Sequence, residues 1–223
     1  MDECAAQPTS PAAADQLAAL VERIGACRIC VEHPIGAPLP HAPRPVVRVS
    51  GTARLLIAGQ APGARVHASG LPFDDPSGDR LRDWLGLDRE RFYDVSRVAV
   101  AAMGFCFPGY DARGADRPPR PECRARWHDA LFALMPQVEL VVAVGRAAQD
   151  FHARRLGRAY DRKALMAECV RHFAAGREAA PRLIVLPHPS WRNTGWLRRN
   201  PWFEAEVLPE LKRSVEKVIK FTA

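Results

Sequence analysis

The stretch from Arg54 to Gly63, RLLIAGQAPG, restricts the fold of this chain more than any other. Its apolar run, Leu55 to Ala58, is long enough for a strand buried on both faces and too short for a helix. The turn from Gly59 to Gly63 has two glycines that let the backbone approach a ligand and a proline that ends ladder bonding. Because small molecules bind beyond the carboxyl ends of parallel strands, this turn is a candidate binding loop, and a plain strand-to-helix turn is the alternative.

Three more apolar runs predict strands, and the segments between them have helical spacing. The further predicted strands are Val95 to Met103, Leu140 to Val144 and Leu183 to Leu186. The predicted helices are Asp15 to Ile24, Ser77 to Leu85 with Ser77 as its cap, a segment after Cys123, a segment from Arg146, Lys163 to Phe173, and Trp202 to Ile219 with a bend near Pro209. Strands that alternate with helices predict an α/β fold whose parallel sheet is covered on both faces.

A chain of 223 residues with 48% apolar composition can form one substantial core, so we expect a single domain over residues 13–223. Residues 1–12 are small and proline-containing and are expected to be disordered. No apolar run approaches the roughly 20 residues of a membrane span, and the acidic start lacks the apolar run of a secretory signal. We therefore expect a cytoplasmic protein without a membrane partner.

The formal net charge of +7 favours a polyanionic partner, with a basic solvated surface as the alternative. After the last predicted strand, cations alternate with aromatic rings: Arg192, Arg198 and Arg199 with Trp191, Trp196 and Trp202. Such a mixture occurs on surfaces that grip phosphates while they stack on or wedge between bases. The alternative is that the tryptophans pack the final helix, and this is our expectation for Trp202.

His188 directly follows the last predicted strand, between Pro187 and Pro189, which restrict its backbone. An imidazole at the ligand-binding edge of a sheet, beside the hydroxyl of Ser190, is a candidate for chemistry on a bound molecule. A lone histidine more often makes a structural hydrogen bond, and that is the alternative interpretation of this residue.

Six cysteines in a cytoplasmic chain are expected to be reduced or bound to metal rather than paired. Cys27 and Cys30 are separated by two residues, and Cys106 and Cys123 follow at longer spacings. Four such thiolates can bind zinc or an iron–sulfur cluster. Spacing alone favours zinc slightly, because structural zinc sites are common. The two remaining cysteines have no partner by spacing.

The ordered set of motifs resembles the uracil-DNA glycosylase superfamily, most closely its iron–sulfur branch, family 4. That branch has an N-terminal Cys-X2-Cys, a first motif like GEAPG, a Pro-Phe pair, two further cysteines and an HPS-type motif. The matching residues are Cys27 and Cys30, Gly59 to Gly63, Pro72-Phe73, Cys106 and Cys123, and His188-Pro189-Ser190. The resemblance covers residues 27 to about 205. It implies a three-layer α/β/α sandwich with a four-stranded parallel sheet, and a [4Fe–4S] cluster on the four cysteines, far from the chemistry.

The same resemblance implies a DNA repair enzyme that excises uracil from DNA by base flipping and leaves an abasic site. Phe73 would stack on the uracil ring. Main-chain groups at Gln60 and Ala61, beside Gly59, would bind the base and help place the water. His188 would hydrogen-bond uracil O2 as negative charge develops there. These roles make Gln60 and His188 the expected catalytic residues.

DNA contacts are expected from the segment after His188. The resemblance gives Ser190 a part in holding the DNA backbone, and charge alone suggests the same for Arg192, Arg198 and Arg199. We expect a monomer that acts on single- or double-stranded DNA.

The chain departs from the family pattern at two places. Gln60 stands where the first motif usually has Glu, so no carboxylate is available there to activate water, and the nearest acids are Asp74 and Asp75. Val95 to Val98 also lacks the Asn that reads the uracil edge in relatives. Two alternatives therefore stay open: a glycosylase for another deaminated base such as hypoxanthine, and a catalytically silent nucleic-acid-binding protein.

Overall fold

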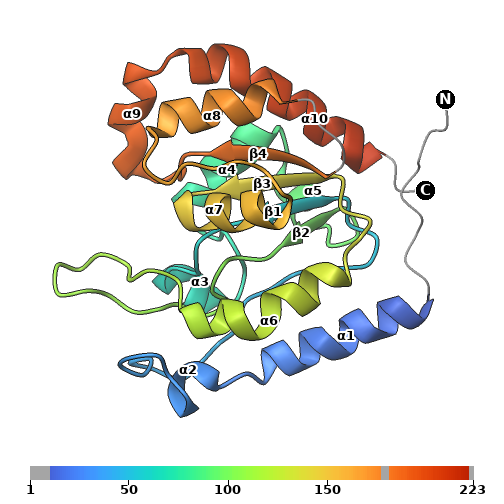
Figure 1. Cartoon of the computed structure of the whole chain (residues 1–223), viewed down its shortest axis with the longest axis vertical. Helices are drawn as coiled ribbons and strands as arrows, with labels where there is room; N and C mark the ends of the chain where they lie inside the picture. The colour runs from blue at the N-terminus through green and yellow to red at the C-terminus, as the bar shows by residue number, and fades with distance from the viewer. Residues whose placement is uncertain (1–10, 177–180, 221–223) are drawn as a thin grey trace.

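The computed structural model describes residues 11–176 and 181–220, and at its centre is a four-stranded parallel sheet (Figure 1). The strands are β1 (Leu55–Ala58), β2 (Val98–Val100), β3 (Leu140–Val144) and β4 (Arg182–Leu186). Their order in the sheet is β2-β1-β3-β4, and all three neighbouring pairs are parallel. The predicted α/β fold with a parallel sheet is therefore confirmed.

Helices cover both faces of this sheet. They are α1 (Pro11–Gly25), α2 (Ile29–Glu32), α3 (Ala64–Ser69), α4 (Pro76–Leu85), α5 (Arg89–Tyr93), α6 (Pro121–Ala133), α7 (Arg146–Arg155), α8 (Met166–Ala175), η1 (Trp191–Asn193), α9 (Thr194–Arg199), η2 (Phe203–Val207) and α10 (Leu208–Lys220). In Figure 1, α4, α8 and α10 lie above the sheet and α1, α3 and α6 below it, so the molecule is a three-layer sandwich.

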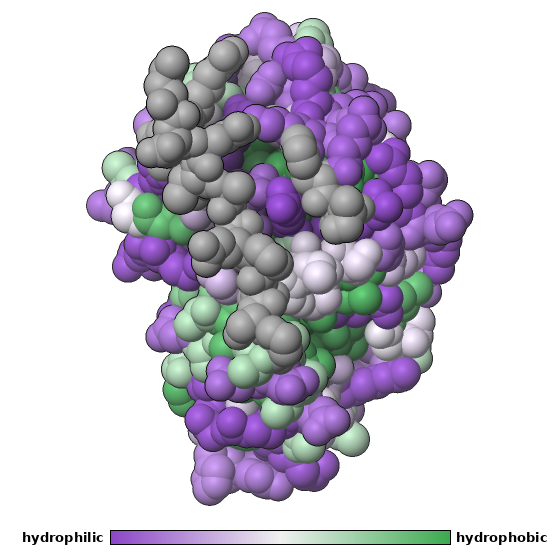
Figure 2. Space-filling view, turned by 90° about the vertical axis from the view of Figure 1, so that its right-hand side faces the viewer, coloured by the Kyte–Doolittle hydropathy of each residue, from purple (hydrophilic) through white to green (hydrophobic). Residues whose placement is uncertain are grey.

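The surface seen from the right of that view is divided by polarity. Hydrophilic residues dominate its upper part and its lower end, and apolar residues gather in a band near mid-height (Figure 2). Within residues 11–176 and 181–220, none of the helices combines the length and apolarity needed to cross a membrane.

The core is built on β1 and β3, whose side chains are buried along the whole length of both strands. Leu55, Leu56 and Ile57 have no exposed surface at all. Each buried side chain of this size contributes about 1.5–3 kcal/mol relative to an exposed one. Successive side chains of a strand point to opposite faces, so a strand apolar at every position must be covered on both sides. The helical layers provide this cover.

Several boundaries differ from the predicted ones. α1 begins at Pro11 rather than Asp15, because proline is well accommodated in the first turn of a helix. Residues 1–10, which carry most of the expected disordered segment, lie outside the described residues. β2 is shorter than the predicted strand, although N–H groups beyond it still bond to carbonyls of β1 and its glycine turn.

The predicted bend near Pro209 takes the form of the π-helical segment η2, which leads directly into α10. Proline has no N–H and its ring clashes with the carbonyl four residues earlier, here that of Ala205. Widening the preceding turn relieves this clash. Four short helices, α2, α3, α5 and α9, were not predicted, because four to six residues show no apolar period.

The prediction that Ser77 caps α4 is wrong. The N-cap is Asp75, whose Oδ1 accepts a hydrogen bond from the Gly78 N–H at 2.9 Å. Pro76 occupies the first helical position, so the cap must be the residue before it. The Ser77 hydroxyl donates to the same carboxylate oxygen.

The loop before α4 holds Phe73 in an unusual conformation. With φ of 56°, Phe73 is the one non-glycine residue with positive φ in the described part of the chain. The Phe73 carbonyl accepts a hydrogen bond from Arg82, and the Tyr93 hydroxyl donates to the neighbouring Pro72 carbonyl at 2.9 Å. Gly78 lies so close that a β-carbon there would be 1.8 Å from the Phe73 oxygen. The loop geometry thus depends on a glycine at position 78.

We expect Gly78→Ala to lower the free energy of unfolding by about 1–3 kcal/mol, because the added methyl group must displace the Phe73 backbone. Urea denaturation measures this change. Gly25→Ala is the matched control, since a β-carbon there meets no atom within 4 Å and alanine favours a helix. Equal stability of the two variants would contradict the described packing.

Two histidines are buried between α6 and α7. His128 and His152 are fully buried among aromatic rings. Nε2 of His128 lies 2.9 Å from the Ala102 carbonyl oxygen, so this nitrogen carries a proton and donates it. Burial lowers the pKa of His128 to about 4 and lowers the pKa of His152 well below its usual value. Both rings are therefore neutral at neutral pH.

These histidines should make stability fall in mildly acidic solution. In the unfolded chain they protonate near pH 6.5, whereas the folded protein keeps them neutral to much lower pH. Below pH 6.5 the unfolded state binds more protons, so the free energy of unfolding decreases as pH falls from 6.5 towards 4. For His128 alone the loss is on the order of 3 kcal/mol.

Urea unfolding at a series of pH values tests this expectation. His128→Gln, whose amide can donate to the Ala102 carbonyl, should show a smaller decrease than the wild type. His172→Gln, on the exposed side of α8, should follow the wild-type curve. Parallel curves for the wild type and His128→Gln would show that this histidine does not govern acid stability.

Candidate active site

A cavity lies at the carboxyl edge of the sheet, the edge from which α3 and α9 follow in Figure 1. Its lining includes the glycine turn after β1, the end of β2 and residues from three further segments. Those segments contribute Phe73 and Asp75 from the loop before α4, Asp116 from the loop before α6, and His188 from the end of β4. The structure thus brings together the predicted base-binding and catalytic residues: Gly59, Gln60, Ala61, Phe73 and His188.

The glycine turn lies directly against the ring of Phe73. A β-carbon at Gly59 would be 3.2 Å from Cζ of Phe73, so a larger residue there would push the ring away. The Gln60 carbonyl accepts a hydrogen bond from the Gly104 N–H at 2.9 Å. The Gln60 side chain lies against Gly145 at the end of β3. Glycine at these positions lets two strand ends and an aromatic ring meet closely.

His188 is held in one tautomer by its own loop. The Ser190 N–H donates to Nδ1 at 3.2 Å, so the single proton of the neutral ring is on Nε2. Burial lowers the pKa of His188, as does Arg192, and the carboxylates of Asp75 and Asp116 oppose this. The result is a neutral imidazole whose Nε2–H is a hydrogen-bond donor at the cavity.

Arg80 of α4 fixes the same loop, and sequence reasoning did not identify it. Its Nη1 donates to the carbonyls of Pro189 and Ser190 at 3.1 and 3.2 Å. These partners are 109 and 110 residues away along the chain, so no local pattern could indicate the contact. The Asn193 side chain adds a bond of 2.7 Å to the His188 carbonyl. The His188 loop is therefore fixed from two sides.

The acidic residues near the cavity divide into three cases. Asp74 forms an ion pair with Arg89 at 2.9 Å and does not line the cavity. A hydrogen bond from Arg89 also lowers the Asp74 pKa. Asp75 lines the cavity but also caps α4. Asp116 lines the cavity as well and was not predicted, because it stands in a long irregular segment without periodicity.

The wall formed by the end of β2 is apolar. Val100 and Ala102 line the cavity there, and neither side chain can form a hydrogen bond. The end of β2 thus gives the cavity an apolar wall, while Asp75, Asp116 and His188 provide polar groups elsewhere.

The predicted DNA-contacting residues follow His188 directly. Arg192, Arg198 and Arg199 are all exposed. Trp191 is 76% exposed, with the Arg192 guanidinium 5.8 Å from its ring centre. Trp196 and Trp202 instead pack edge-to-face on Phe203, as expected for Trp202. Trp191 is therefore the tryptophan of this segment that remains available to a partner.

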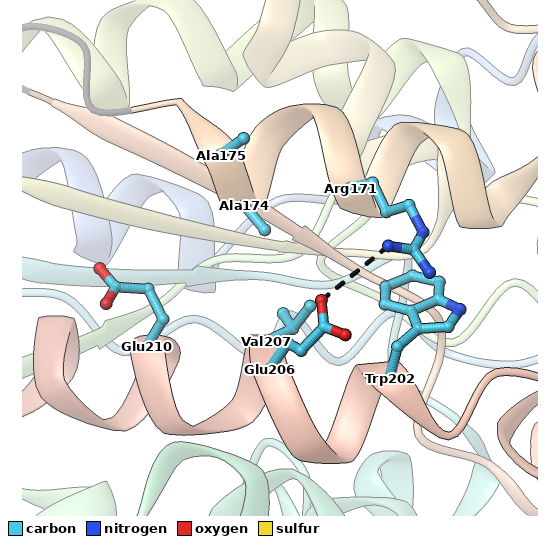
Figure 3. A pocket seen from close by; sticks show the side chains of 7 residues that line it. All are labelled: Arg171, Ala174, Ala175, Trp202, Glu206, Val207 and Glu210. Carbon is cyan, nitrogen blue, oxygen red and sulfur yellow. Dashed lines mark ion pairs between the residues drawn. The ribbon is translucent and has the colours of Figure 1, made fainter.

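A second hollow lies between α8 and the start of the C-terminal helical segment (Figure 3). There the Arg171 guanidinium lies 3.8 Å from the centre of the Trp202 ring and 3.9 Å from a Glu206 carboxylate oxygen. Glu210, at the other end, bonds to Arg182 and a neighbouring arginine, which lower its pKa to about 2. The charged side chains that line this hollow form ion pairs with other residues of the protein. No predicted site residue lines it.

The four cysteines of the predicted metal site line one small cavity, with Phe105 and Trp127 among its other walls. Trp127 Nε1–H donates to the sulfur of Cys27 at 3.2 Å, and the Phe105 N–H donates to that of Cys123 at 3.3 Å. Burial raises the pKa of Cys30 to about 11 and that of Cys106 to about 12.

Such thiols ionise only beside a strong positive charge, and thiolates are what a metal or cluster binds. The donor set therefore fits a bound iron–sulfur cluster in its chemistry. Across residues 11–176 and 181–220, however, no three His, Cys, Asp or Glu side chains converge closely enough to hold a single metal ion.

Two solved structures each match about three quarters of this chain. A Methanosarcina acetivorans protein assigned to the uracil DNA glycosylases matches 76% of this chain and 95% of its own, with 14% identity and a TM-score of 0.48. SMUG2 of Pedobacter heparinus matches 74% of each chain, with 13% identity and a TM-score of 0.37.

The family comparison is decisive. The model of the uracil DNA glycosylase superfamily matches residues 47–212, which is well over half of the chain and includes every residue that lines the cavity except Val46. Cys27 and Cys30 lie outside the matched region. With the parallel sheet, the glycine turn and His188 at one edge, the chain belongs to the uracil DNA glycosylase superfamily.

Proposed function

We propose that this protein is a DNA glycosylase that hydrolyses the N-glycosidic bond of uracil in DNA and leaves an abasic site. The observation that carries the proposal is the pairing of an aromatic ring, Phe73, with a neutral Nε2–H donor, His188, in one cavity at the sheet edge. Such a cavity can hold a planar base by its face and by a carbonyl oxygen. The base must leave the helical stack to reach it.

His188 would stabilise the departing base. The glycosidic bond breaks towards an oxocarbenium-like sugar and a uracil anion, with negative charge developing on O2. Nε2–H is placed before the reaction by the Ser190 N–H, so its dipole need not reorganise. Because burial keeps the ring neutral, His188 donates a hydrogen bond without giving up a proton. Phe73 would hold the ring by stacking.

Gln60 cannot act as a general base. Its amide can orient a water molecule, but it cannot take a proton at neutral pH. Catalysis would then rest on leaving-group stabilisation and on negative charges that face the cationic sugar.

The DNA backbone would be held by the segment after His188. Arg192, Arg198 and Arg199 are exposed there, and Trp191 can wedge into or stack on the bases that flank the flipped nucleotide. The net charge of +7 agrees with a polyanionic partner.

Two other functions are separated from this one by a single assay. Oligonucleotides that carry uracil or hypoxanthine are incubated with the protein, and abasic sites are cleaved with alkali. Release from hypoxanthine alone would indicate a different base specificity. A gel shift without release of any base would indicate a nucleic-acid-binding protein without catalytic activity.

His188→Ala should lower the single-turnover rate of uracil release by a factor on the order of 10²–10³, the usual effect of a lost oxyanion donor. Phe73→Ala should have a smaller effect, because stacking contributes about 1–3 kcal/mol. Single-turnover release, with DNA affinity measured separately, distinguishes chemistry from binding. His172→Ala, on α8, is the control that should match the wild type. A near-normal rate for His188→Ala would refute the assigned role.

We also propose that Cys27, Cys30, Cys106 and Cys123 hold a [4Fe–4S] cluster with a structural role. Support comes from their shared cavity and from the N–H groups that point at two of the sulfurs, since hydrogen bonds to sulfur are common around such clusters. A cubane binds its four thiolates at separate irons, so they need not converge on one point, as the ligands of a zinc ion do.

Protein purified without oxygen should therefore be brown and contain about four irons per chain. Cys106→Ser should lose iron and colour and should unfold at a lower temperature, because cluster binding contributes to folding. Cys169→Ser is the matched control, since Cys169 is buried but lies outside the cavity. A colourless protein with one tightly bound zinc would overturn the assignment.

A further inference from the structure

Asp116 is the second carboxylate, besides Asp75, that lines the cavity. It lines the cavity with His188 but is itself exposed, so it lies at the mouth rather than the floor. Its Oδ2 lies 3.9 Å from the point where a β-carbon at Gly63 would be. Within the described part of the chain, its side chain has no hydrogen bond or ion pair. A negative charge at the mouth of a DNA-binding cavity repels phosphates, so a compensating use is expected.

The segment that carries Asp116 is well defined. Tyr110 and Asp116 form an antiparallel bridge, and the Arg117 N–H donates to the Gly109 carbonyl at 2.9 Å. The Asp111 carboxylate closes the turn by accepting from the N–H groups of Arg113 and Ala115 at 2.8 and 2.9 Å. We call residues 109–117 the hairpin. Its base packs on Pro40, since a β-carbon at Gly109 would lie 2.9 Å from the proline ring.

The hairpin faces the His188 loop across the cavity. The pKa of Asp111 is lowered first by the Ala115 and Arg113 N–H groups and then by Arg117 and Arg192, the last of which belongs to the His188 loop. Asp116 in turn is one of the two carboxylates that raise the pKa of His188. Two independent residues of the hairpin thus lie within electrostatic reach of that loop.

The place of Asp116 at the mouth of the cavity determines which part of a bound nucleotide it can contact. Under the proposed function, a flipped base would lie between Phe73 and His188, and the sugar to which it is attached would stay at the mouth. Positive charge develops on that sugar as the bond breaks. A carboxylate at the mouth therefore faces the atoms that gain positive charge, whereas the donor at the floor faces those that gain negative charge.

Asp75 is the competing carboxylate, and its hydrogen bonds commit it to the cap of α4. Its Oδ1 already accepts from the Ser77 hydroxyl and the Gly78 N–H. Asp116 has no such donors among the described residues, so both of its oxygens are available to a water molecule.

We propose that Asp116 is a catalytic residue that activates the attacking water in place of the carboxylate that position 60 lacks. This inference rests on the proposed glycosylase function. The water oxygen bonds to C1′ of the sugar as the C1′–N1 bond breaks, and the bonding electron pair leaves with the uracil, whose O2 is held by His188. The water proton passes to the Asp116 carboxylate and then to solvent, and the uracil anion takes a proton from solvent.

Single-turnover uracil release is measured for the wild type, Asp116→Asn, Asp116→Ala and Asp111→Asn, with DNA affinity measured for each. Asp116→Ala should lower the rate by a factor on the order of 10², the usual size of a general-base effect. Its DNA affinity should not fall, since a charge that repels phosphate has been removed. Asp111→Asn is the control on the same hairpin and should keep the wild-type rate, because the amide oxygen still accepts the turn's N–H groups.

Added formate separates chemistry from structure. Formate is small enough to occupy the space left in Asp116→Ala, so it should raise the rate of uracil release by that variant at least tenfold. It should not change the rate of Asp116→Asn, in which the side chain fills that space. Loss of rate without rescue would show that Asp116 has a structural role.

Other outcomes identify what has failed. Suppose that the wild type and Asp116→Asn release uracil equally fast, whereas Asp75→Asn releases it much more slowly. Asp75 would then be the residue that activates the water, and this inference would be wrong. If the wild type releases no base from any oligonucleotide, the proposed function itself is wrong, and the inference falls with it.

Discussion

Burial of β1 on both faces is the constraint on which the rest of this structure depends. Leu55 to Ile57 have no exposed surface, so neither face of this strand can be in contact with solvent. Helices must therefore cover the sheet on both sides. Parallel strands then follow, because each crossover helix returns the chain to the same end of the sheet. All four strand ends meet at one edge, and the glycine turn after β1 and the His188 loop after β4 both leave from it.

Helix α4 converts that meeting of loops into a defined cavity. Its N-terminal cap, Asp75, and its buried Gly78 hold the Phe73 loop in place. Its Arg82 holds the Phe73 carbonyl, while Arg80 reaches the carbonyls after His188. One ten-residue helix thus positions both Phe73 and His188, the two residues proposed to hold the base. Both arginines act on the cavity through hydrogen bonds to backbone carbonyls.

Much of this arrangement could be predicted from the sequence, because apolar runs and helical spacing are local. The four strands and the longer helices lie in segments with such patterns, and the glycine turn and His188 follow two of the strands. Phe73 lies in an irregular loop and was expected from the family resemblance alone. The cap of α4 was mispredicted, because Ser77 and Asp75 are equally good caps and Pro76 decides between them. Arg80 and Asp116 could not be found, because their roles depend on contacts between loops distant in sequence. The cysteine quartet shares a cavity as expected, and the sequence alone does not distinguish zinc from a cluster.

The hydrogen bonds from Arg80 to Pro189 and Ser190 also bear on the order in which the parts of the cavity form during folding. They join residues 109 and 110 positions apart, so they form only after β4 has docked beside β3. Long loops close slowly relative to local helices, and during synthesis the N-terminal part of a chain folds first. The first three strands can therefore associate while the His188 loop is still missing. The cavity is completed only with the last strand, so an incompletely folded chain lacks the proposed active site.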